Sequence, residues 1–412
     1  RMIRDRYITN KTFISSNYQA KEIYIRSTDY NRTLISAYSN LAGMYTSYGV
    51  EGENYPTKAD VPEWPEGYIP IPIHTYDYPT DHIGNPDSRC PRQNQLYQLI
   101  MDSPEYKAYA SDPQVSYVLK YITEQSNYDT NIETLYDIQD PMFCETAHID
   151  DLTGIPNSNM SDYYPWYFTG QIPYMVDDIL DKQEDFQNGL GNPGGVNGID
   201  VSVEIPKLRA GETIKYISGM IHGAIACNDN PDDTSCSPFY KKLKYFALSA
   251  HDTTVDAFLT LIGAKKYVIP SGYPNYSAAL FIELFKTKNG EYFVKFLYHA
   301  DPDSGFKAIT AFVKGCDPTS NICPLSVFDD LVATYAHNGD FETLCNTPPE
   351  GVSPEPTSTT GAPNNINTES TTSTMSTPST SQTEPTTTTD STAGVSLASA
   401  LLAILAAFIF SF

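Results

Sequence analysis

The chain has 412 residues, with 26 Lys and Arg against 50 Asp and Glu, and a formal net charge of −24. A chain this acidic is a poor electrostatic match for nucleic acid, which excludes nucleic-acid binding as its main function. Hydrophobic residues make up 40% of the chain and aromatic residues 12%, enough for a large core, which excludes wholesale disorder. The single long uncharged apolar run, residues 395–412, excludes a multi-pass membrane protein.

Two segments predict a strand followed by a loop and a helix. Residues 22–26, EIYIR, are β-prone, and residues 31–46 carry apolar side chains at helical spacing. Residues 245–263 repeat the arrangement with a continuous apolar run, a polar loop and a helix that ends at Gly263. Continuous apolar strands are typical of parallel sheets that are buried on both faces. The sequence therefore predicts an α/β fold with a central mixed, mainly parallel sheet flanked by helices.

The part of the chain between these two units has a different composition. Between roughly residues 55 and 200, Pro, Tyr, Asp and Asn dominate, with helical patterns at 93–110 and 175–188. This predicts a smaller, mostly helical cap inserted between the two strand–helix units. Farther along, two apolar runs at 279–285 and 291–298, on either side of an Asn-Gly turn, predict a hairpin that extends the sheet.

The last 65 residues or so predict an attachment to the folded part. Residues 351–394 contain 23 Ser or Thr, with several Pro, so a stalk over residues 348–394 is expected, O-glycosylated or else a bare linker. Residues 395–412 are uncharged, and no Lys or Arg follows Lys314. Because the basic flank of a membrane span is missing, a cleaved glycolipid-anchor signal is favoured, with a short single span or an artefact as alternatives. The expected location is the extracellular face of a membrane.

The cysteines indicate an oxidising compartment. They lack the CxxC or Cys/His spacing of a zinc site, so disulfides are the better interpretation, and their odd number leaves one thiol free or paired outside the chain. Spacing alone leaves three pairings open: Cys316 with Cys323, Cys227 with Cys236, and Cys90 with Cys345. Four sequons also fit a secretory route, with lysosomal or secreted forms as further destinations: Asn10, Asn31, Asn159 and Asn275.

Candidate anion-binding side chains follow both predicted parallel strands. Arg26 is the first of four polar residues, 26–29, at the end of the first strand, and His251 and Asp252 follow the second. Because the carboxyl ends of parallel strands meet at one edge of a sheet, these groups are expected to lie together. The alternatives are a local ion pair of Arg26 with Asp29 and a helix-capping role for Asp252 worth ~1 kcal/mol. A helix N-terminus would also keep the His251 imidazole neutral.

Other catalytic chemistries lack their sequence markers. The chain has no GxSxG, HExxH, GxxxxGK[ST] or GxGxxG motif, which excludes the corresponding serine hydrolases, zinc proteases and nucleotide-binding folds. The remaining histidines are scattered, and surface or capping roles are expected for them. Neither a metal site nor a cofactor is predicted.

Four stretches of the sequence resemble the motifs of one known family. They are residues 23–45, IYIRSTDYNRTLISAYSNLAGMY, residues 70–92, residues 208–221, and residues 248–263, LSAHDTTVDAFLTLIG. The family is that of the histidine acid phosphatases, the acid phosphatase and phytase branch of the histidine phosphatase superfamily. The first stretch is similar to its segment with a phosphate-binding arginine, and the last is similar to its His-Asp signature. The resemblance extends over nearly all of residues 1–347, which are identified as the phosphatase domain.

The resemblance implies a role for each candidate residue. Arg26 would bind phosphate oxygens, His251 would hydrogen-bond the phosphoryl group, and Asp252 would be the general acid that protonates the leaving alcohol. The implied activity is hydrolysis of phosphate monoesters at acidic pH through a phosphohistidine intermediate. Broad substrates are expected, including aromatic ones that Tyr side chains and Trp64 or Trp166 would stack on. A homodimer is suggested by the family alone.

The family's disulfides provide a second comparison. Cys90 with Cys345 and Cys316 with Cys323 match bridges that the resemblance implies. Cys144 matches a family half-cystine, but the region of its expected partner, around Ala279, has no Cys. Either Cys144 is free, or the pair at Cys227 and Cys236 is arranged differently.

One departure from the family affects the catalytic prediction. The family's first signature, RHGxRxP, holds the nucleophilic histidine, and this motif occurs nowhere in the 412 residues. Residues 1–7 resemble the helix that follows it, so the sequence is expected to be N-terminally incomplete. A chain beginning here would lack the first core strand and leave a central position of the sheet empty. The alternatives are a non-catalytic stalked surface glycoprotein and a phosphatase for a narrower substrate, such as an inositol phosphate or a phosphorylated sugar.

Overall fold

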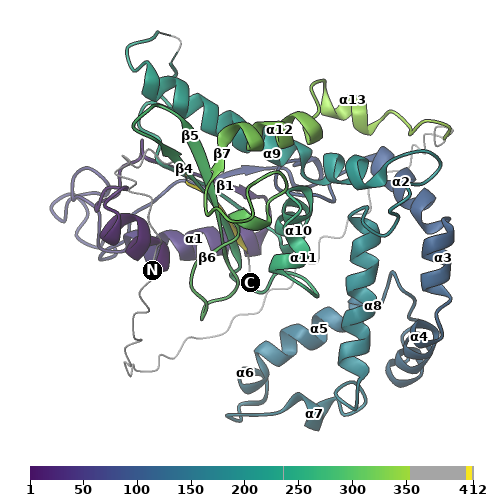
Figure 1. The fold of residues 1–412 in the computed structure, drawn as a ribbon. Coiled ribbons are helices and arrows are strands. Elements are labelled where there is room, and N and C mark those ends of the chain that lie inside the picture. Colours follow the sequence, from purple (N-terminus) through teal and green to yellow (C-terminus); the bar gives the residue numbers. More distant parts are fainter. Residues whose placement is uncertain (235, 353–404, 411–412) are drawn as a thin grey trace.

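The computed structural model describes residues 1–352, except residue 235, and residues 405–410. Its centre is a mixed sheet with strand order β2-β1-β3-β8-β4-β5-β6, and β7 pairs with β5 (Figure 1). The strands from β2 to β8 in this order are parallel, whereas β4, β5, β6 and β7 pair in antiparallel fashion. The predicted α/β class is therefore confirmed. The strand bounds are β1 Ile23–Thr28, β2 His74–Tyr76, β3 Tyr245–Ala250, β4 Ala279–Lys286, β5 Tyr292–His299, β6 Lys307–Ala308, β7 Cys323–Pro324 and β8 Leu405–Phe410.

Each face of the sheet is covered by its own apolar layer, because successive side chains of a strand point to opposite faces. In β3, Tyr245 and Ala247 join the layer formed with η1 and α1. Phe246 and Leu248 join the opposite layer, which contains α9, α10 and α12. The helices that cover the sheet are η1 (Arg4–Asn10), α1 (Asn31–Tyr45), α9 (Val201–Asp229), α10 (Asp252–Leu261), α11 (Lys265–Val268) and α12 (Leu325–Tyr335), with the 3₁₀ turn η3 (Thr310–Phe312). The last helix, α13 (Phe341–Cys345), packs in a separate apolar cluster away from the strands (Figure 1).

Between β2 and α9 the chain is helical, as the composition predicts, and part of it has an apolar core of its own. The pattern at 93–110 forms two helices, because Ser103 caps a new helix at Pro104, its hydroxyl accepting the Tyr106 N–H at 3.2 Å. The elements of this region are η2 (Tyr78–Thr80), α2 (Pro91–Met101), α3 (Pro104–Ala110), α4 (Pro113–Ser126), α5 (Tyr136–Ala147), α6 (Ile149–Thr153), α7 (Met160–Tyr163) and α8 (Ile172–Gln187). We call α4 to α8 the cap helices.

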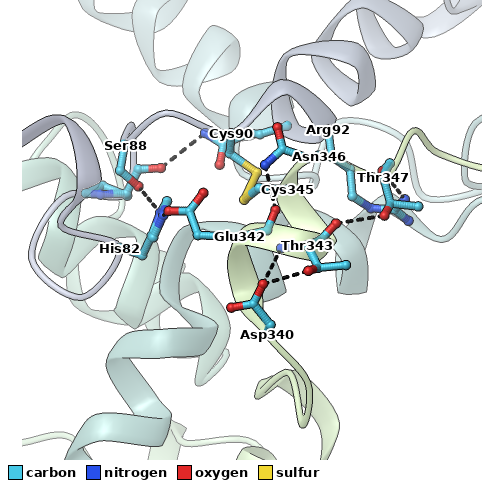
Figure 2. The surroundings of a disulfide bond; sticks show 12 residues. His82, Ser88, Cys90, Arg92, Asp340, Glu342, Thr343, Cys345, Asn346 and Thr347 are labelled. Atoms are coloured by element: carbon cyan, nitrogen blue, oxygen red, sulfur yellow. Dashed lines mark hydrogen bonds and ion pairs between the residues drawn. A yellow bond between two sulfur atoms is a disulfide. The ribbon is translucent and has the colours of Figure 1, made fainter. Parts of the chain in front are cut away.

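Three disulfides fasten the described chain, and they are the three pairings that the spacing left open. Cys316–Cys323 and Cys227–Cys236 close short loops. Cys90–Cys345 joins the start of α2 to the end of α13 across 255 residues. Figure 2 shows this bridge with its polar surroundings, in which the His82 imidazole contacts Ser88 Oγ at 2.7 Å and Glu342 Oε1 at 2.8 Å. Cys144 is free, which resolves the alternative about its partner.

The C-terminal apolar run contributes a strand to the centre of the sheet. β8 lies parallel to β3, with Ala247 opposite Ala407, and antiparallel to β4, with Phe281 opposite the same residue. The position expected to be empty is thus occupied. The predicted stalk, from residue 353 on, and residues 395–404 of the predicted anchor lie outside the described residues. Within the described part of the chain, no helix is long and apolar enough to cross a membrane.

The position of β8 predicts that a proline within it destabilises this chain. Ala407→Pro removes a backbone N–H from a strand paired on both sides, so the free energy of unfolding should fall by about 3 kcal/mol or more. Urea unfolding followed by circular dichroism measures the effect. Ala398→Pro, which lies before the strand, is the matched control. Equal unfolding midpoints for the two variants would contradict the placement of β8.

Candidate active site

The site lies where the parallel strands β1 and β3 end side by side. Their register pairs Ser27 with Ser249, so the residues that follow are brought to the same edge of the sheet. There Thr28 Oγ1 lies 3.1 Å from His251 Nε2, although the two residues are 223 positions apart in sequence. The prediction that the two strand ends meet is confirmed.

His251 is held as a neutral imidazole. Arg32 Nη2 lies 3.3 Å from His251 Nδ1, and because a guanidinium can only donate, Nδ1 must accept. The ring proton is therefore on Nε2, where it is donated to Thr28 Oγ1. Burial, with a smaller contribution from the Arg32 charge, lowers the pKa of His251 to about 4, while Asp87 opposes the shift. Burial and the charge of Arg32 therefore favour the neutral ring that the sequence predicts.

Asp252 is the first residue of α10, and its surroundings make it a weaker acid than an exposed aspartate. Its Oδ1 accepts the Thr253 N–H at 2.8 Å. Burial raises the pKa of Asp252, the Thr253 N–H and Arg32 oppose the shift, and the charge of Asp140 adds to it. The carboxyl group therefore keeps its proton to a higher pH than an exposed aspartate does. The N-cap of α10 is His251, not Asp252, and the His251 backbone N–H donates to Thr254 Oγ1 at 3.1 Å.

Arg26 and Arg32, which both lie in residues 23–45, occupy different environments. The expectation that Arg26 lies beside His251 at the site requires a correction. The Arg26 side chain is 5% exposed and forms an ion pair of 2.5 Å with the buried Asp81, lying over the Tyr76 ring. It does not line the cavity beside His251. Arg32, in the first turn of α1, does line it. The sequence analysis missed Arg32, although it stands in the same family-like stretch, at the helix start where anions bind.

A cavity of about 420 Å³ opens from His251, Asp252 and Arg32. Its walls come from one face of α5, from α8 and from the loop before β4. Trp64 and Trp166, expected as stacking partners, do not line it. The wall residues are Tyr136, Gln139, Asp140, Phe143, Cys144, Asp177, Leu180, Gly272, Tyr273, Pro274, Asn275 and Tyr276.

The predicted glycosylation sites are accessible in the structure. All four sequon asparagines are exposed: Asn10, Asn31, Asn159 and Asn275. Asn275 lies at the cavity itself. Among the described residues, no group of His, Cys, Asp and Glu side chains is arranged to hold a metal ion.

A buried ionic cluster fastens the cap to the helix that carries Asp252. Lys265 Nζ lies 2.6 Å from Glu184 Oε2 of α8 and 2.9 Å from Asp256 Oδ1 of α10, and all three side chains are at most 2% exposed. Asn188 Nδ2 donates to Asp256 Oδ2 at 2.6 Å. Burial and then the charge of Asp256 raise the pKa of Glu184 above its usual range, while Lys265 opposes the shift, and this favours the protonated form of Glu184 over that of Asp256. The cluster therefore contains one full ion pair, between Lys265 and Asp256.

Comparisons with known proteins agree with this architecture. The sequence model of the histidine phosphatase superfamily (branch 2) matches residues 1–299. The chain belongs to this family, which confirms the resemblance seen in the sequence. Relatives include "Putative acid phosphatase 10" of Caenorhabditis elegans, 30% identical over 84% of this chain and 82% of that protein. The human prostatic acid phosphatase is 26% identical over 84% of this chain and 75% of its own length.

Two further matches come from cattle and from a bacterium. The bovine lysosomal acid phosphatase is 27% identical over 79% of this chain and 64% of its own length. A phytase from Citrobacter braakii has a similar fold, with a TM-score of 0.50 and 10% sequence identity over 81% of this chain and 84% of that one. This likeness supports the fold alone.

The ionic cluster predicts unequal effects of two substitutions. Lys265→Met leaves the buried Asp256 carboxylate unpaired, so the free energy of unfolding should fall by about 3–5 kcal/mol. Glu184→Gln replaces an already uncharged group by another and should cost less than half as much. Urea unfolding at neutral pH measures both. Equal losses would show that Glu184 is ionised and that the charge assignment is wrong.

Proposed function

We propose that this protein is an acid phosphatase that hydrolyses phosphate monoesters at acidic pH. The observation that carries the proposal is the meeting of Arg32, His251 and Asp252 at one end of a single cavity. A fixed positive charge, a neutral imidazole and a protonated carboxyl group are the groups that transfer of a phosphoryl group to a nucleophile requires. Membership of a family with named acid phosphatases supports the same reaction class.

In the proposed reaction, each of these residues has a separate task. The Arg32 guanidinium binds the phosphoryl oxygens and stabilises their charge as the ester bond breaks. The His251 Nε2–H, which Thr28 Oγ1 accepts in the structure, is donated to a phosphoryl oxygen instead when the substrate binds. Asp252 gives its proton to the alcohol oxygen as the P–O bond breaks, and it accepts a proton from water when the phosphoryl group is hydrolysed.

The nucleophile of the family is a histidine in RHGxRxP, a motif that the 412 residues do not contain. The proposed phosphohistidine intermediate therefore requires a histidine encoded before Arg1. Secretion is part of the proposal, supported by the three disulfides and the four exposed sequons. Attachment to a membrane surface is proposed from the sequence alone, and it requires that residues 405–410 leave their place between β3 and β4. Homodimer formation is proposed from the family alone.

The first test is to determine the coding sequence that precedes Arg1 and to express the whole protein. A signal peptide followed by RHGxRxP, with hydrolysis of p-nitrophenyl phosphate at acidic pH, is the expected result. The proposal would be overturned if an initiator Met and signal peptide join directly to Arg1, or if the motif has lost its histidine, and if in addition the protein shows no hydrolysis. A non-catalytic surface glycoprotein would then be the better account.

The two arginines are separated by paired substitutions in the whole protein. Arg32→Ala should lower kcat/KM for p-nitrophenyl phosphate about 10²- to 10³-fold and weaken inhibition by inorganic phosphate, while the unfolding midpoint changes little. Arg26→Ala should instead destabilise the fold by about 3–5 kcal/mol, because it leaves Asp81 buried and unpaired. Steady-state kinetics and urea unfolding give both readouts. The reverse pattern would return the phosphate-binding role to Arg26.

The raised pKa of Asp252 predicts the alkaline limit of the pH profile. The general acid acts only in its protonated form, so activity should be full below its pKa and fall as pH rises through it. Asp252→Asn should lower kcat about 10²- to 10⁴-fold for an alkyl phosphate and remove this limb. The effect should be smaller for p-nitrophenyl phosphate, whose leaving group needs less protonation. An unchanged alkaline limb in Asp252→Asn would assign it to another group.

A further inference from the structure

The outer part of the cavity has a chemistry that the proposed phosphatase reaction does not use. Every fourth or third residue of α5 faces the cavity, which places Tyr136, Asp140 and Phe143 on one wall. Asp177 of α8 and the loop that contains Tyr273 and Tyr276 form the others. Together these walls surround the space that the alcohol part of a substrate would fill once its phosphate lies at Arg32 and His251.

The charge of this outer part is negative. Arg32 is the one Lys or Arg side chain among the lining residues of the described chain, and it lies at the His251 end. Asp140 and Asp177 come from two different helices and line the other walls. The Asp140 carboxylate accepts the Tyr136 hydroxyl at 3.1 Å, which fixes it toward the cavity. The cavity therefore has a cationic end and an anionic end.

Aromatic rings stand beside the two carboxylates. Phe143 packs on Tyr276 with ring centroids 5.1 Å apart, and Tyr136 meets Tyr273 at 6.4 Å. The faces of aromatic rings carry partial negative charge, and rings gathered around a small space attract ammonium groups, quaternary ones included. Two carboxylates and four aromatic rings therefore line the same part of the cavity, a combination that suits a cation with an apolar surface.

We propose that the preferred substrates are phosphate monoesters whose alcohol carries an ammonium group. The phosphate binds at Arg32 and His251, and the ammonium group lies among Asp140, Asp177 and the aromatic rings. The site disfavours alcohols with further phosphates or carboxylates, because these would face two carboxylates. The inference rests on the proposed function for the placement of the phosphate, and it concerns the alcohol part alone.

Binding measurements test this inference without any requirement for turnover. Isothermal titration of the 412-residue chain at neutral pH compares phosphocholine with 3,3-dimethylbutyl phosphate, which has the same shape and no ammonium charge. We expect phosphocholine to bind about three- to thirtyfold more tightly. Equal dissociation constants would overturn the inference.

Matched variants assign the preference to the proposed wall. Asp140→Asn and Asp177→Asn should each reduce the ratio of the two dissociation constants at least about threefold and leave the affinity for 3,3-dimethylbutyl phosphate almost unchanged. Asp178→Asn is the control, because this exposed aspartate of α8 does not line the cavity. A ratio that both wall variants leave unchanged would overturn the inference, and so would an equal drop in Asp178→Asn.

The outcomes also separate this inference from the proposed function. If the whole protein fails to hydrolyse p-nitrophenyl phosphate while the ammonium preference and its loss in the wall variants are seen, the phosphatase proposal fails and the site remains. If hydrolysis is seen and kcat/KM is equal for phosphocholine and its uncharged isostere, the inference fails and the phosphatase proposal remains.

Discussion

The parallel pairing of β1 with β3 is the constraint on which the rest of the site depends. Because both strands run in the same direction and end in register, the loop after each of them opens at the same edge of the sheet. The contact between Thr28 and His251 is the direct result. Arg32 reaches the imidazole from the first turn of α1, so its position follows from the length of the connection after β1. A shift of one residue in the register would separate these groups.

The second constraint is the connection between the cap helices and the sheet. The cavity has one wall on α10 and others on α5 and α8, so its shape depends on how α8 is held against α10. Lys265 does this through its buried contacts with Glu184 of α8 and Asp256 of α10. Its neighbour Lys266 adds ion pairs to Asp181 and Asp185 on the same helix. An arrangement that separated α8 from α10 would leave a buried charge unpaired, at a cost of about 3–5 kcal/mol.

The sequence predicted those parts of the fold that depend on local pattern, and the rest depends on packing. The apolar strand before His251 is short and bounded by a polar loop, and the hairpin is marked by its Asn-Gly turn, so both are predictable from local sequence, and both are confirmed. The strand end and the family resemblance both predict a phosphate-binding role for Arg26. Its side chain instead contacts Asp81 and Tyr216, which are distant in sequence, and only the packing of the folded chain brings them to Arg26. α5 escaped prediction because Pro141 interrupts its helical pattern. An uncharged apolar run such as 395–412 suits a helix or a buried strand equally.

The bridge between Cys90 and Cys345 has a consequence for how the protein withstands proteases. It closes a covalent ring between two cysteines that lie 255 positions apart in sequence. The ring contains the cap helices, α10 and every residue that lines the cavity except Arg32. A single cut in one of its exposed loops therefore leaves both fragments joined by the disulfide and by the packing around it. In the unfolded chain the same ring removes conformational entropy equivalent to about 5 kcal/mol, by the loop-closure account. A molecule that is cut once in this way can keep its cavity assembled. Cleavage of the chain and loss of the folded cavity are therefore separate events.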